Sequence, residues 1–423
     1  DREFVFLPPE SKAGKVRMSM YLVMAFRNLW RNSHRTLITT ASVFFAVVLV
    51  LFTRSMQRGT YEHVIRTSLR TSTGFLQVQA PEFRDKRSLE NSMELDESLI
   101  KKALAIKHVT HAVPRIESFA LASTGEDSRG VMITAIDPSS EDRMNNLSER
   151  ITDGRFLESG DRGVLAGAKL AEYLSLKVND SLVLISQGYH GASAAGIYPV
   201  IGVVDLPVPD LNANVVYMPL EEAQWFFAMP GRVTSLAVMI DDADKLGEVK
   251  AEAGDIFSGD YVVLDWKEML PELVQFIQVD NAGGVIMLGI LYLVIGFGIF
   301  GTVMMMSAER RREFAVLISI GMKKWKLNLM VFLETVIIGL MGSIAGMLFS
   351  IPLLLYMKGH PIKLTGDVAE MMIRYGFEPL IPFLVEPSIF INQTLTVLAI
   401  SILASLYPLW STEKIKVSDV LRA

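Results

Sequence analysis

Long uncharged runs alternate with charged segments along these 423 residues, and the pattern predicts four helices that cross a membrane. Residues 281–308 carry no charge and lead directly into the charged segment 309–313. A helix of about 20 apolar residues crosses the roughly 30 Å hydrocarbon layer and satisfies its own backbone hydrogen bonds there. Residues 36–53, 327–357 and 387–412 meet the same test, and the first of these spans is expected to continue to residue 56.

Basic residues gather on one side of these spans. They precede the first span, fill the short segment between the second and third, and follow the fourth: Arg27, Arg31, Arg35; Arg310, Arg311, Arg312, Lys323, Lys324, Lys326; Lys414, Lys416, Arg422. Lys and Arg in short loops stay in the cytoplasm. Both chain ends and residues 309–326 are therefore predicted to be cytoplasmic, whereas residues 57–280 and the loop 358–386 face the other side.

The segment before the first span has an amphipathic pattern. Residues 16–35 are predicted to form a helix that lies in the membrane interface, with Trp30 at the depth of the lipid headgroups. A helix packed against protein is the alternative. Residues 1–15 are expected to be a disordered tail and residues 413–423 a cytoplasmic tail, and the first span is expected to act as its own signal for membrane insertion.

Residues 57–280 alternate short apolar runs with helical patterns, which predicts a mixed α/β domain. The expected strands are 75–80, 130–136, 181–186, 198–204, 214–218, 235–240 and 261–266, and the expected helices are 96–106, 168–174 and 220–227. Their order in the sheet does not follow from the pattern. The expected fold is thus a membrane α-helical protein with four transmembrane helices and a large extracytoplasmic mixed α/β domain between helices 1 and 2.

Composition supports this division and narrows the function. Half of the residues are hydrophobic and the mean hydropathy is +0.33, yet 21% are charged, so a sizeable part must face water. The net charge of -5 and the absence of a basic stripe argue against a nucleic-acid partner. Without cysteine, the chain has no disulfide, thiolate metal site or Cys nucleophile.

Motifs that would carry catalysis are missing from the sequence. It contains no phosphate-binding G-x-x-x-x-G-K-[ST] loop, no H-E-x-x-H and no G-x-S-x-G. His108 and His111 have helical spacing, but without a third ligand we interpret them as a solvated surface pair. Asp241, Asp242 and Asp244 resemble a cation loop but are interpreted as a turn after a strand. We therefore expect no enzyme activity, no metal and no cofactor bound by this chain.

The cytoplasmic segment SAERRREFAVLISIGM places Phe314, Leu317 and Ile318 at helical spacing on a stretch too short to be a domain. One interpretation is a connector whose charges only set the topology. The other is a short helix that projects below the membrane and engages a separate protein.

Several segments together resemble four-span permeases of the MacB/FtsX type, and most of all the lipoprotein-releasing LolC/LolE subunits. They are RNLWRNSHRTLIT, DGRFLESGDRGVLAGAKLAEYLSLKVNDSLVLIS, YPVIGVVD, NVVYMPLEEAQWFF, ERRREFAVLISIGM, FLETVIIGLMGSIAG and LYPLWSTEKIKVSDVLR. Each is a weak motif alone, but their order and spacing cover nearly the whole chain.

This resemblance implies a dimeric ABC-transporter permease in a bacterial inner membrane, paired with itself or a related permease. Two copies of a separate ATP-binding subunit would hold ATP and Mg, and the substrate would be a lipoprotein drawn from the surrounding membrane lipids. The resemblance assigns the cytoplasmic segment to contact with the ATPase, through Glu309, Arg310, Arg311, Arg312, Glu313, Phe314, Leu317, Ile318, Gly321 and Met322. Within this set, Phe314 and Leu317 are expected to supply the buried contacts and the arginines a charged rim.

Two further sets of residues carry hypotheses about the substrate. Apolar residues of the first span could line a cavity for acyl chains or simply face bilayer lipid: Phe44, Phe45, Val48 and Phe52. The stretch 186–198 corresponds to the region that contacts a periplasmic carrier chaperone in the family, but here it lacks proline. We expect it to be a mobile loop with Tyr189, His190 and Tyr198 as possible chaperone contacts, or else a plain solvent loop.

Polar and small residues inside the third span have predicted structural roles. Glu334, two turns after Lys326, can reach the interface or a basic partner, and we expect a structural ion pair rather than a substrate contact. Gly342, Gly346 and Ser350 are expected to allow close helix packing. Two other functions stay open at this point. One is MacB-like efflux of a periplasmic substrate, and the other is FtsX-like signalling to a cell-wall hydrolase.

Overall fold

The computed structural model describes residues 23–31, 33–374 and 378–413, which form two compact units. The α/β unit consists of Tyr61–Ile277 and Lys363–Leu380. The helical unit consists of Gln278–Ile362 together with the described residues before Tyr61 and after Leu380. The predicted tail 1–15, and all of the predicted tail 413–423 except Glu413, lie outside the described residues.

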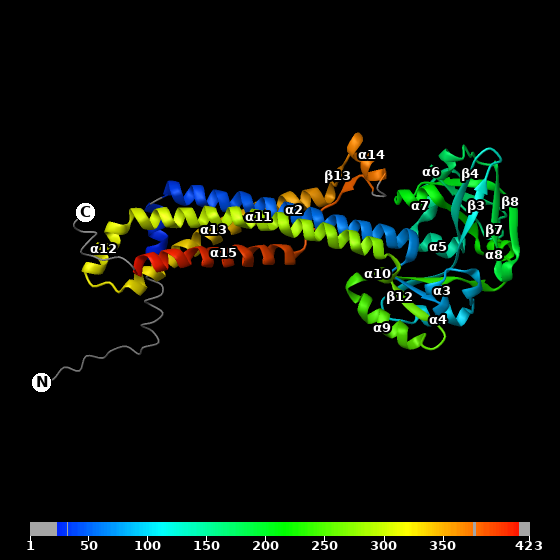
Figure 1. Cartoon of the computed structure of the whole chain (residues 1–423), viewed down its shortest axis with the longest axis horizontal. Coiled ribbons are helices and arrows are strands. Elements are labelled where there is room, and N and C mark those ends of the chain that lie inside the picture. Colours follow the sequence, from blue (N-terminus) through cyan, green and yellow to red (C-terminus); the bar gives the residue numbers. More distant parts are fainter. Residues whose placement is uncertain (1–22, 32, 375–377, 414–423) are drawn as a thin grey trace. The chain divides into compact units, whose positions relative to one another are not determined.

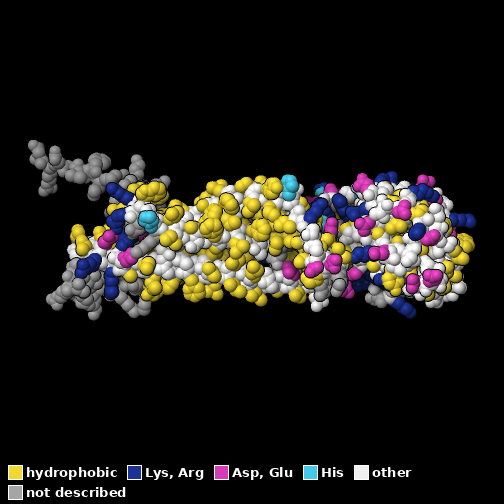
Figure 2. All heavy atoms as spheres, turned by 90° about the horizontal axis from the view of Figure 1, so that it is seen from above, with side chains coloured by type: hydrophobic (Ala, Val, Ile, Leu, Met, Phe, Trp, Pro, Cys, Tyr) yellow, Lys and Arg dark blue, Asp and Glu magenta, His cyan; other side chains and the backbone are white. Residues whose placement is uncertain are grey.

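Four helices of the helical unit are long and apolar enough to cross a membrane, as predicted. They are α2 Ser33–Ser68, α11 Pro271–Glu309, α13 Lys324–Gly359 and α15 Pro387–Glu413 (Figure 1). The first two extend well beyond the uncharged runs, because a helix needs apolar side chains only where it meets lipid. Figure 2 shows hydrophobic side chains covering this bundle on the face drawn, with Lys and Arg gathered at the end where the α11–α13 connection lies.

Small residues of α13 bring the helices together, which confirms the predicted packing role. A Cβ atom added to Gly342 would lie 2.6 Å from Val43 of α2, and one added to Gly346 would lie 2.9 Å from Val47. On the other side of α13, Gly339 approaches Ser401 of α15. Ser350 is also buried. A larger residue at any of the three glycines would therefore push neighbouring helices apart.

Residues 23–31 form a helix, within the range predicted for the interfacial segment. One face, with Ala25 and Leu29, is buried in the helical unit, while Val23, Phe26 and Trp30 expose apolar surface. Both interpretations of this segment thus have a structural counterpart. One side packs against protein, and the other side has the apolar character expected of contact with lipid.

The α/β unit is built from a mixed sheet. The strands of this sheet are β1 Leu76–Gln79, β3 Val109–Ser123, β4 Ser128–Ile136, β5 Ile151–Gly154, β6 Val164–Gly167, β7 Ser181–Gln187, β8 Ser193–Val204, β9 Val215–Pro219, β11 Ser235–Ile240 and β12 Val262–Asp265. A separate antiparallel pair is formed by β2 Met93–Glu94 and β10 Arg232–Val233. The main helices of this unit are α4 Glu97–Leu104, α5 Pro138–Asn145, α6 Ala168–Tyr173, α8 Leu220–Phe226 and α9 Leu246–Ile256. All seven predicted strands and all three predicted helices are present.

The long strand β3 organises the sheet. Its first half pairs with β11 as far as Arg115, and its second half pairs with β7 from Leu121, while β4 runs along its other side. The pairings β3–β4, β4–β9, β9–β6, β6–β8, β8–β7 and β7–β3 therefore close into a ring. Buried side chains such as Ala122, Leu184 and Val216 fill its interior. The sheet thus has a fork where β3 leaves β11 and joins β7.

Two segments that were predicted to be loops contain regular structure. The stretch 186–198 is not a mobile loop, because β7 and β8 pair from Ser181 and Pro199 to Gln187 and Ser193, and only the short turn between them is unpaired. Residues 358–386 contain β13 Ile362–Lys363, α14 Asp367–Arg374 and β14 Leu380–Ile381. Lys363–Leu380 belongs to the α/β unit, where Glu378 bonds His63 at 2.7 Å.

Candidate functional site

A short helix, α12 Arg311–Ser319, follows α11, which confirms the predicted helix in this connection. It ends before Gly321, whose φ of +100° reverses the chain ahead of α13. A residue with a Cβ atom is strained in this conformation, so glycine suits the position. The connection between the second and third spans thus consists of the short helix α12 and a tight turn at Gly321.

A buried ion pair holds this connection to α13. Arg310 donates through Nη1 to both carboxylate oxygens of Glu334, at 3.0 and 2.8 Å. Asn28, from the helix 23–31, donates to the same carboxylate at 2.8 Å. Burying a carboxylate is costly unless its acceptors are filled, and here a cation and an amide fill them. The predicted ion pair of Glu334 is therefore present, with Arg310 as the basic partner.

A second, exposed pair lies beside the first. Arg31 bonds Glu313 at 2.7 Å, and Arg310 also reaches Glu313 at 3.3 Å. Partial burial opposes ionisation of Glu313, but the bonds from Arg31 and Arg310 outweigh it and lower the pKa of this carboxyl group. Together the two pairs join the helix 23–31, α12 and α13 into one cluster, which we call the cytoplasmic clamp (Asn28, Arg31, Arg310, Glu313 and Glu334).

The burial of α12 corrects the predicted contact side. Phe314 is 1% exposed and packs in the core of the helical unit, with Leu317, Ile318 and Met322 partly buried against the same core. Arg310 is likewise buried and cannot serve as rim charge. The outward side instead carries the exposed residues Arg311, Arg312, Val316, Ile320 and Trp325. Val316 is 45% exposed and Ile320 79%.

Three of these residues form one stripe. Arg312, Val316 and Ile320 follow one another at intervals of four, and Ile320 continues the helical hydrogen bonding by donating to the carbonyl of Val316 at 3.0 Å. We call Arg312, Val316 and Ile320 the docking stripe. Sequence periodicity alone missed it, because Phe314, Leu317 and Ile318 give the stronger apolar pattern and that pattern marks the buried face.

The predicted lipid-path residues lie along α2. Phe45 is 68% exposed. Phe44 packs edge-on against Phe349 with ring centroids 5.6 Å apart, and Phe52 packs against Phe383 with ring centroids 5.0 Å apart. Val48 is half-buried. Phe45, Val48 and Phe52 share the side of α2 opposite to Val43 and Val47, given about 100° of rotation per residue. Their role in a lipid path stays a prediction.

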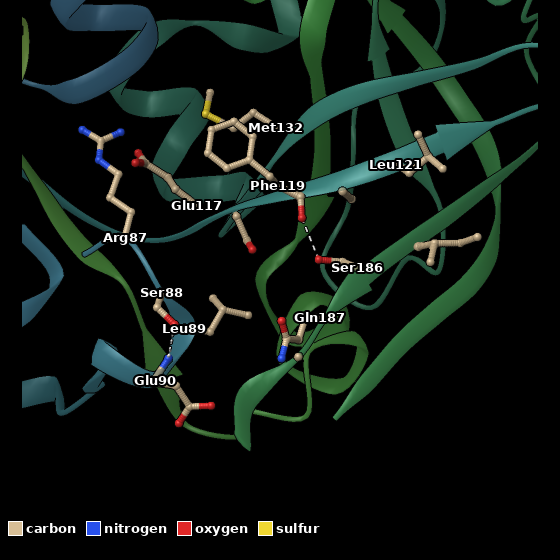
Figure 3. Close-up of a pocket in the computed structure, with 14 residues that line it drawn as sticks. Arg87, Ser88, Leu89, Glu90, Glu117, Phe119, Leu121, Met132, Ser186 and Gln187 are labelled. Carbon is tan, nitrogen blue, oxygen red and sulfur yellow. Dashed lines mark hydrogen bonds between the residues drawn. The ribbon is translucent and has the colours of Figure 1, made fainter. Parts of the chain in front are cut away.

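A cavity of about 420 Å³ opens in the α/β unit at the fork of β3 (Figure 3). Figure 3 shows Arg87 and Glu117 on one side of it and Leu121 on the other, with Phe119 between them. Burial raises the pKa of Glu117, although the nearby Arg115 and Arg87 act against this shift. Ser186 donates to the carbonyl of Phe119 at 2.6 Å. The cavity thus combines a half-buried carboxyl group with exposed apolar side chains.

The predicted chaperone-contact residues lie near this cavity but differ in access. His190 is exposed and bonds Glu90 at 3.0 Å, and the ring of Tyr189 packs at a tilt against that of His190, with the ring centroids 3.9 Å apart. Tyr198 is 4% exposed and faces the core next to Phe226. Tyr198 is therefore unavailable for contact with a partner, which corrects that part of the prediction.

The histidines and aspartates singled out in the sequence form no common site. His108 lies in a turn with a positive φ and bonds Asp241 at 3.0 Å, while His111 lies in β3, so the apparent helical spacing was misleading. Asp242 accepts from the backbone of Asp244, which confirms the predicted turn after a strand. Among the described residues, no group of three or more potential metal ligands comes together.

Comparisons with known proteins cover both units. Residues 36–256 match the model of the MacB-like periplasmic core domain, and residues 285–417 match the FtsX-like permease C-terminal model. The lipoprotein-releasing system transmembrane protein LolC of Xylella fastidiosa is 24% identical over 333 residues, which span 76% of this chain and 79% of that protein.

One further sequence relative and one solved structure also resemble parts of this chain. The lipoprotein-releasing system transmembrane protein LolE of Haemophilus influenzae is 20% identical over 322 residues, which span 73% of this chain and 76% of that protein. The extracellular domain of the ABC-type transporter YknZ from Gram-positive bacteria covers 46% of this chain and 100% of its own, with 18% identity and a TM-score of 0.33.

Proposed function

This chain belongs to the permease family with a MacB-like periplasmic core domain and an FtsX-like C-terminal region, and from this premise we propose that it releases lipoproteins from the bacterial inner membrane. It is an ABC transporter permease of the LolC/LolE/MacB/FtsX type. Similarity to relatives named as lipoprotein-releasing proteins, along about three quarters of the chain, supports the choice of substrate. In this proposal, a separate ATP-binding subunit hydrolyses ATP and the permease works as a dimer.

The cytoplasmic clamp is the observation that carries this proposal. Because Glu334 accepts from both Arg310 and Asn28, a force on α12 is passed to α13 and to the helix 23–31. The docking stripe gives an ATPase an exposed apolar patch with an adjacent cation, a combination typical of energetically important contacts. Closure of two ATPase subunits would then move the membrane helices rather than bend a loose connector.

The substrate class sets the energy requirement. An acyl chain gains about 0.8 kcal/mol for each methylene group buried away from water, so moving a lipid anchor out of the bilayer is uphill. An apolar cavity gives no gain over the bilayer itself, and ATP hydrolysis must therefore supply the ejection. In the proposal, chains enter beside Phe45, Val48 and Phe52 and leave when the helices close. The carrier chaperone that would accept them remains part of the prediction.

The test uses the full permease with its ATPase in proteoliposomes that hold a triacylated lipoprotein. We expect ATP to release the lipoprotein, and V316D/I320D to abolish both release and stimulated ATP hydrolysis while leaving membrane insertion intact. Ile256→Asp is the matched control, because Ile256 is an exposed apolar residue of α9 outside the stripe. Stimulated hydrolysis without lipoprotein release would contradict the proposed substrate and favour efflux or signalling. Unchanged hydrolysis in the double variant would contradict the docking stripe.

A further inference from the structure

A pocket inside the helical unit has no role in the function proposed above. It lies between α2, α11 and α15 and has a volume of about 350 Å³. Val50, Leu288 and Ile389 give it buried apolar walls. Its polar lining includes Arg54, Tyr292 and Gln393. Pockets of this size with apolar walls and a few placed polar groups are typical of small-molecule sites.

Gln393 supplies a donor that has no acceptor. Its side chain is 98% buried, since only 2% is exposed, and its Oε1 accepts from the Tyr292 hydroxyl at 2.7 Å. Its Nε2 has no hydrogen-bond partner among the described residues. A buried N–H group without an acceptor is unfavourable and is rare in native proteins. The amide therefore offers a donor to an acceptor atom of a molecule bound in the pocket.

Arg54 adds a positive charge to the same pocket. Its Nη1 donates to two neutral oxygens, those of Gln57 at 2.9 Å and Asn281 at 3.3 Å. Within the described part of the chain, no carboxylate lies in salt-bridge distance of Arg54, and the nearby Asp280 bonds Gln57 instead at 3.1 Å. Arg58 also lines the pocket, but it is paired with Glu386 at 2.8 Å. Arg54 is thus the cation of this pocket that an anionic ligand would meet.

The position of the pocket selects the ligand. Arg54 directly follows the uncharged run 36–53, so it marks the depth at which the outer lipid headgroups begin in the predicted topology. The phosphodiester group of a phospholipid accepts hydrogen bonds from a guanidinium and from an amide N–H. The acyl chains of the same phospholipid suit the apolar walls of the pocket. The lipid anchor of a triacylated lipoprotein has ester and amide carbonyls but no phosphate for Arg54. Free phosphate would leave the apolar walls unused.

We propose that this pocket binds the phosphate headgroup of an outer-leaflet phospholipid. The site is separate from the predicted lipid path, because Val50 and Arg54 lie on the side of α2 opposite to Phe45 and Phe52. The bound lipid would seal the outer ends of α2, α11 and α15 around the Tyr292–Gln393 hydrogen bond. This proposal is independent of which substrate the permease transports.

The test measures lipid retention on the full permease in detergent by native mass spectrometry. The probes are palmitoyl-oleoyl phosphatidylglycerol, the diacylglycerol with the same chains, and glycerol 3-phosphate without chains. We expect phosphatidylglycerol to bind at least tenfold more tightly than either of the others. Arg54→Gln should weaken its binding by about tenfold or more, as expected for a lost hydrogen bond between charged groups.

Two variants guard against misfolding and one provides a control. Gln393→Glu keeps the shape of the side chain and the acceptor for Tyr292, but replaces the free donor by an anion that repels phosphate. Arg54→Lys keeps the charge and should retain part of the binding. Arg66→Gln removes an exposed arginine of the same helix, outside the pocket, and should change nothing. Equal binding of the diacylglycerol, equal binding of glycerol 3-phosphate, or unchanged binding in both Arg54→Gln and Gln393→Glu would each overturn the proposal.

Discussion

Each unit of this permease contains a buried arginine–glutamate pair, and these two pairs differ in how fully they are enclosed. In the α/β unit, Arg115 and Glu141 are both 1% exposed, and Glu141 also accepts from Asn145 at 2.6 Å. In the helical unit, Arg310 and Glu334 are buried but lie beside the exposed pair of Arg31 and Glu313. Among the described residues, Glu141 is the carboxylate in salt-bridge distance of Arg115, whereas Arg310 is shared between Glu334 and Glu313.

This difference separates a structural role from a mechanical one. Arg115 also donates to the backbone carbonyl of Ser72, at the end of the segment that continues α2 into the α/β unit, so it fixes β3, α5 and this segment together. The cytoplasmic clamp instead joins elements that, in the proposed function, would move together when an ATPase acts on α12. If the enclosed pair breaks, Arg115 keeps a backbone carbonyl as acceptor but no carboxylate in salt-bridge distance among the described residues. A pair with a neighbouring acceptor can adjust without losing every partner.

The largest expected effect is on the enclosed pair. Glu141→Ala leaves the Arg115 guanidinium buried without its carboxylate, and breaking such a pair costs about 3–5 kcal/mol. We expect early unfolding of the α/β unit, seen as rapid proteolysis within this unit of the full permease. The double variant Arg115→Met/Glu141→Leu removes both charges and should recover most of the stability. Equal loss in the single and double variants would show that packing, rather than the unpaired charge, is responsible.

A smaller loss of stability is expected at the clamp. Glu334→Ala leaves Arg310 with Glu313 as a remaining acceptor, so the expected cost is about 1–3 kcal/mol. The effect on function should be larger than this figure indicates, because α12 is then no longer fixed to α13. We expect basal ATP hydrolysis by the assembled complex together with loss of lipoprotein release. Release at the normal rate would mean that the clamp does not transmit the movement.

The smallest effect is expected at the exposed pair. Arg31→Ala should cost about 0.2–1 kcal/mol, the range for surface ion pairs. Because the folded state lowers the pKa of Glu313 below its ordinary 4.5, the contribution of this pair is complete above pH 4.5. It is lost as the pH falls through the lowered pKa. Thermal unfolding of Arg31→Ala and the unchanged protein should therefore converge at acidic pH, and a constant difference between them would contradict this account.

Local patterns in the sequence predicted most of the elements but missed the strand that organises the sheet. The four spans and the seven predicted strands follow from uncharged runs and from β-rich runs between turns, which are properties of neighbouring residues. Strand β3 was missed because Pro114, Arg115 and Glu117 interrupt its apolar pattern. Arg115 is tolerated there only because Glu141 meets it in the fold. Likewise, the glycine-rich stretch 186–198 is ordered by pairing between β7 and β8.

The sequence by itself determined the membrane class, the order of the two units and the presence of a cytoplasmic helix, because charge and hydrophobicity along the chain decide what enters lipid. Only the tertiary structure decided which charged residues face inward. Glu334 meets Arg310 across 24 residues and Asn28 across 306, and no local pattern encodes either distance. The same holds for the docking stripe, since burial of Phe314 left the opposite side of α12 exposed. Which face of a helix is buried depends on the partners that the fold brings to it.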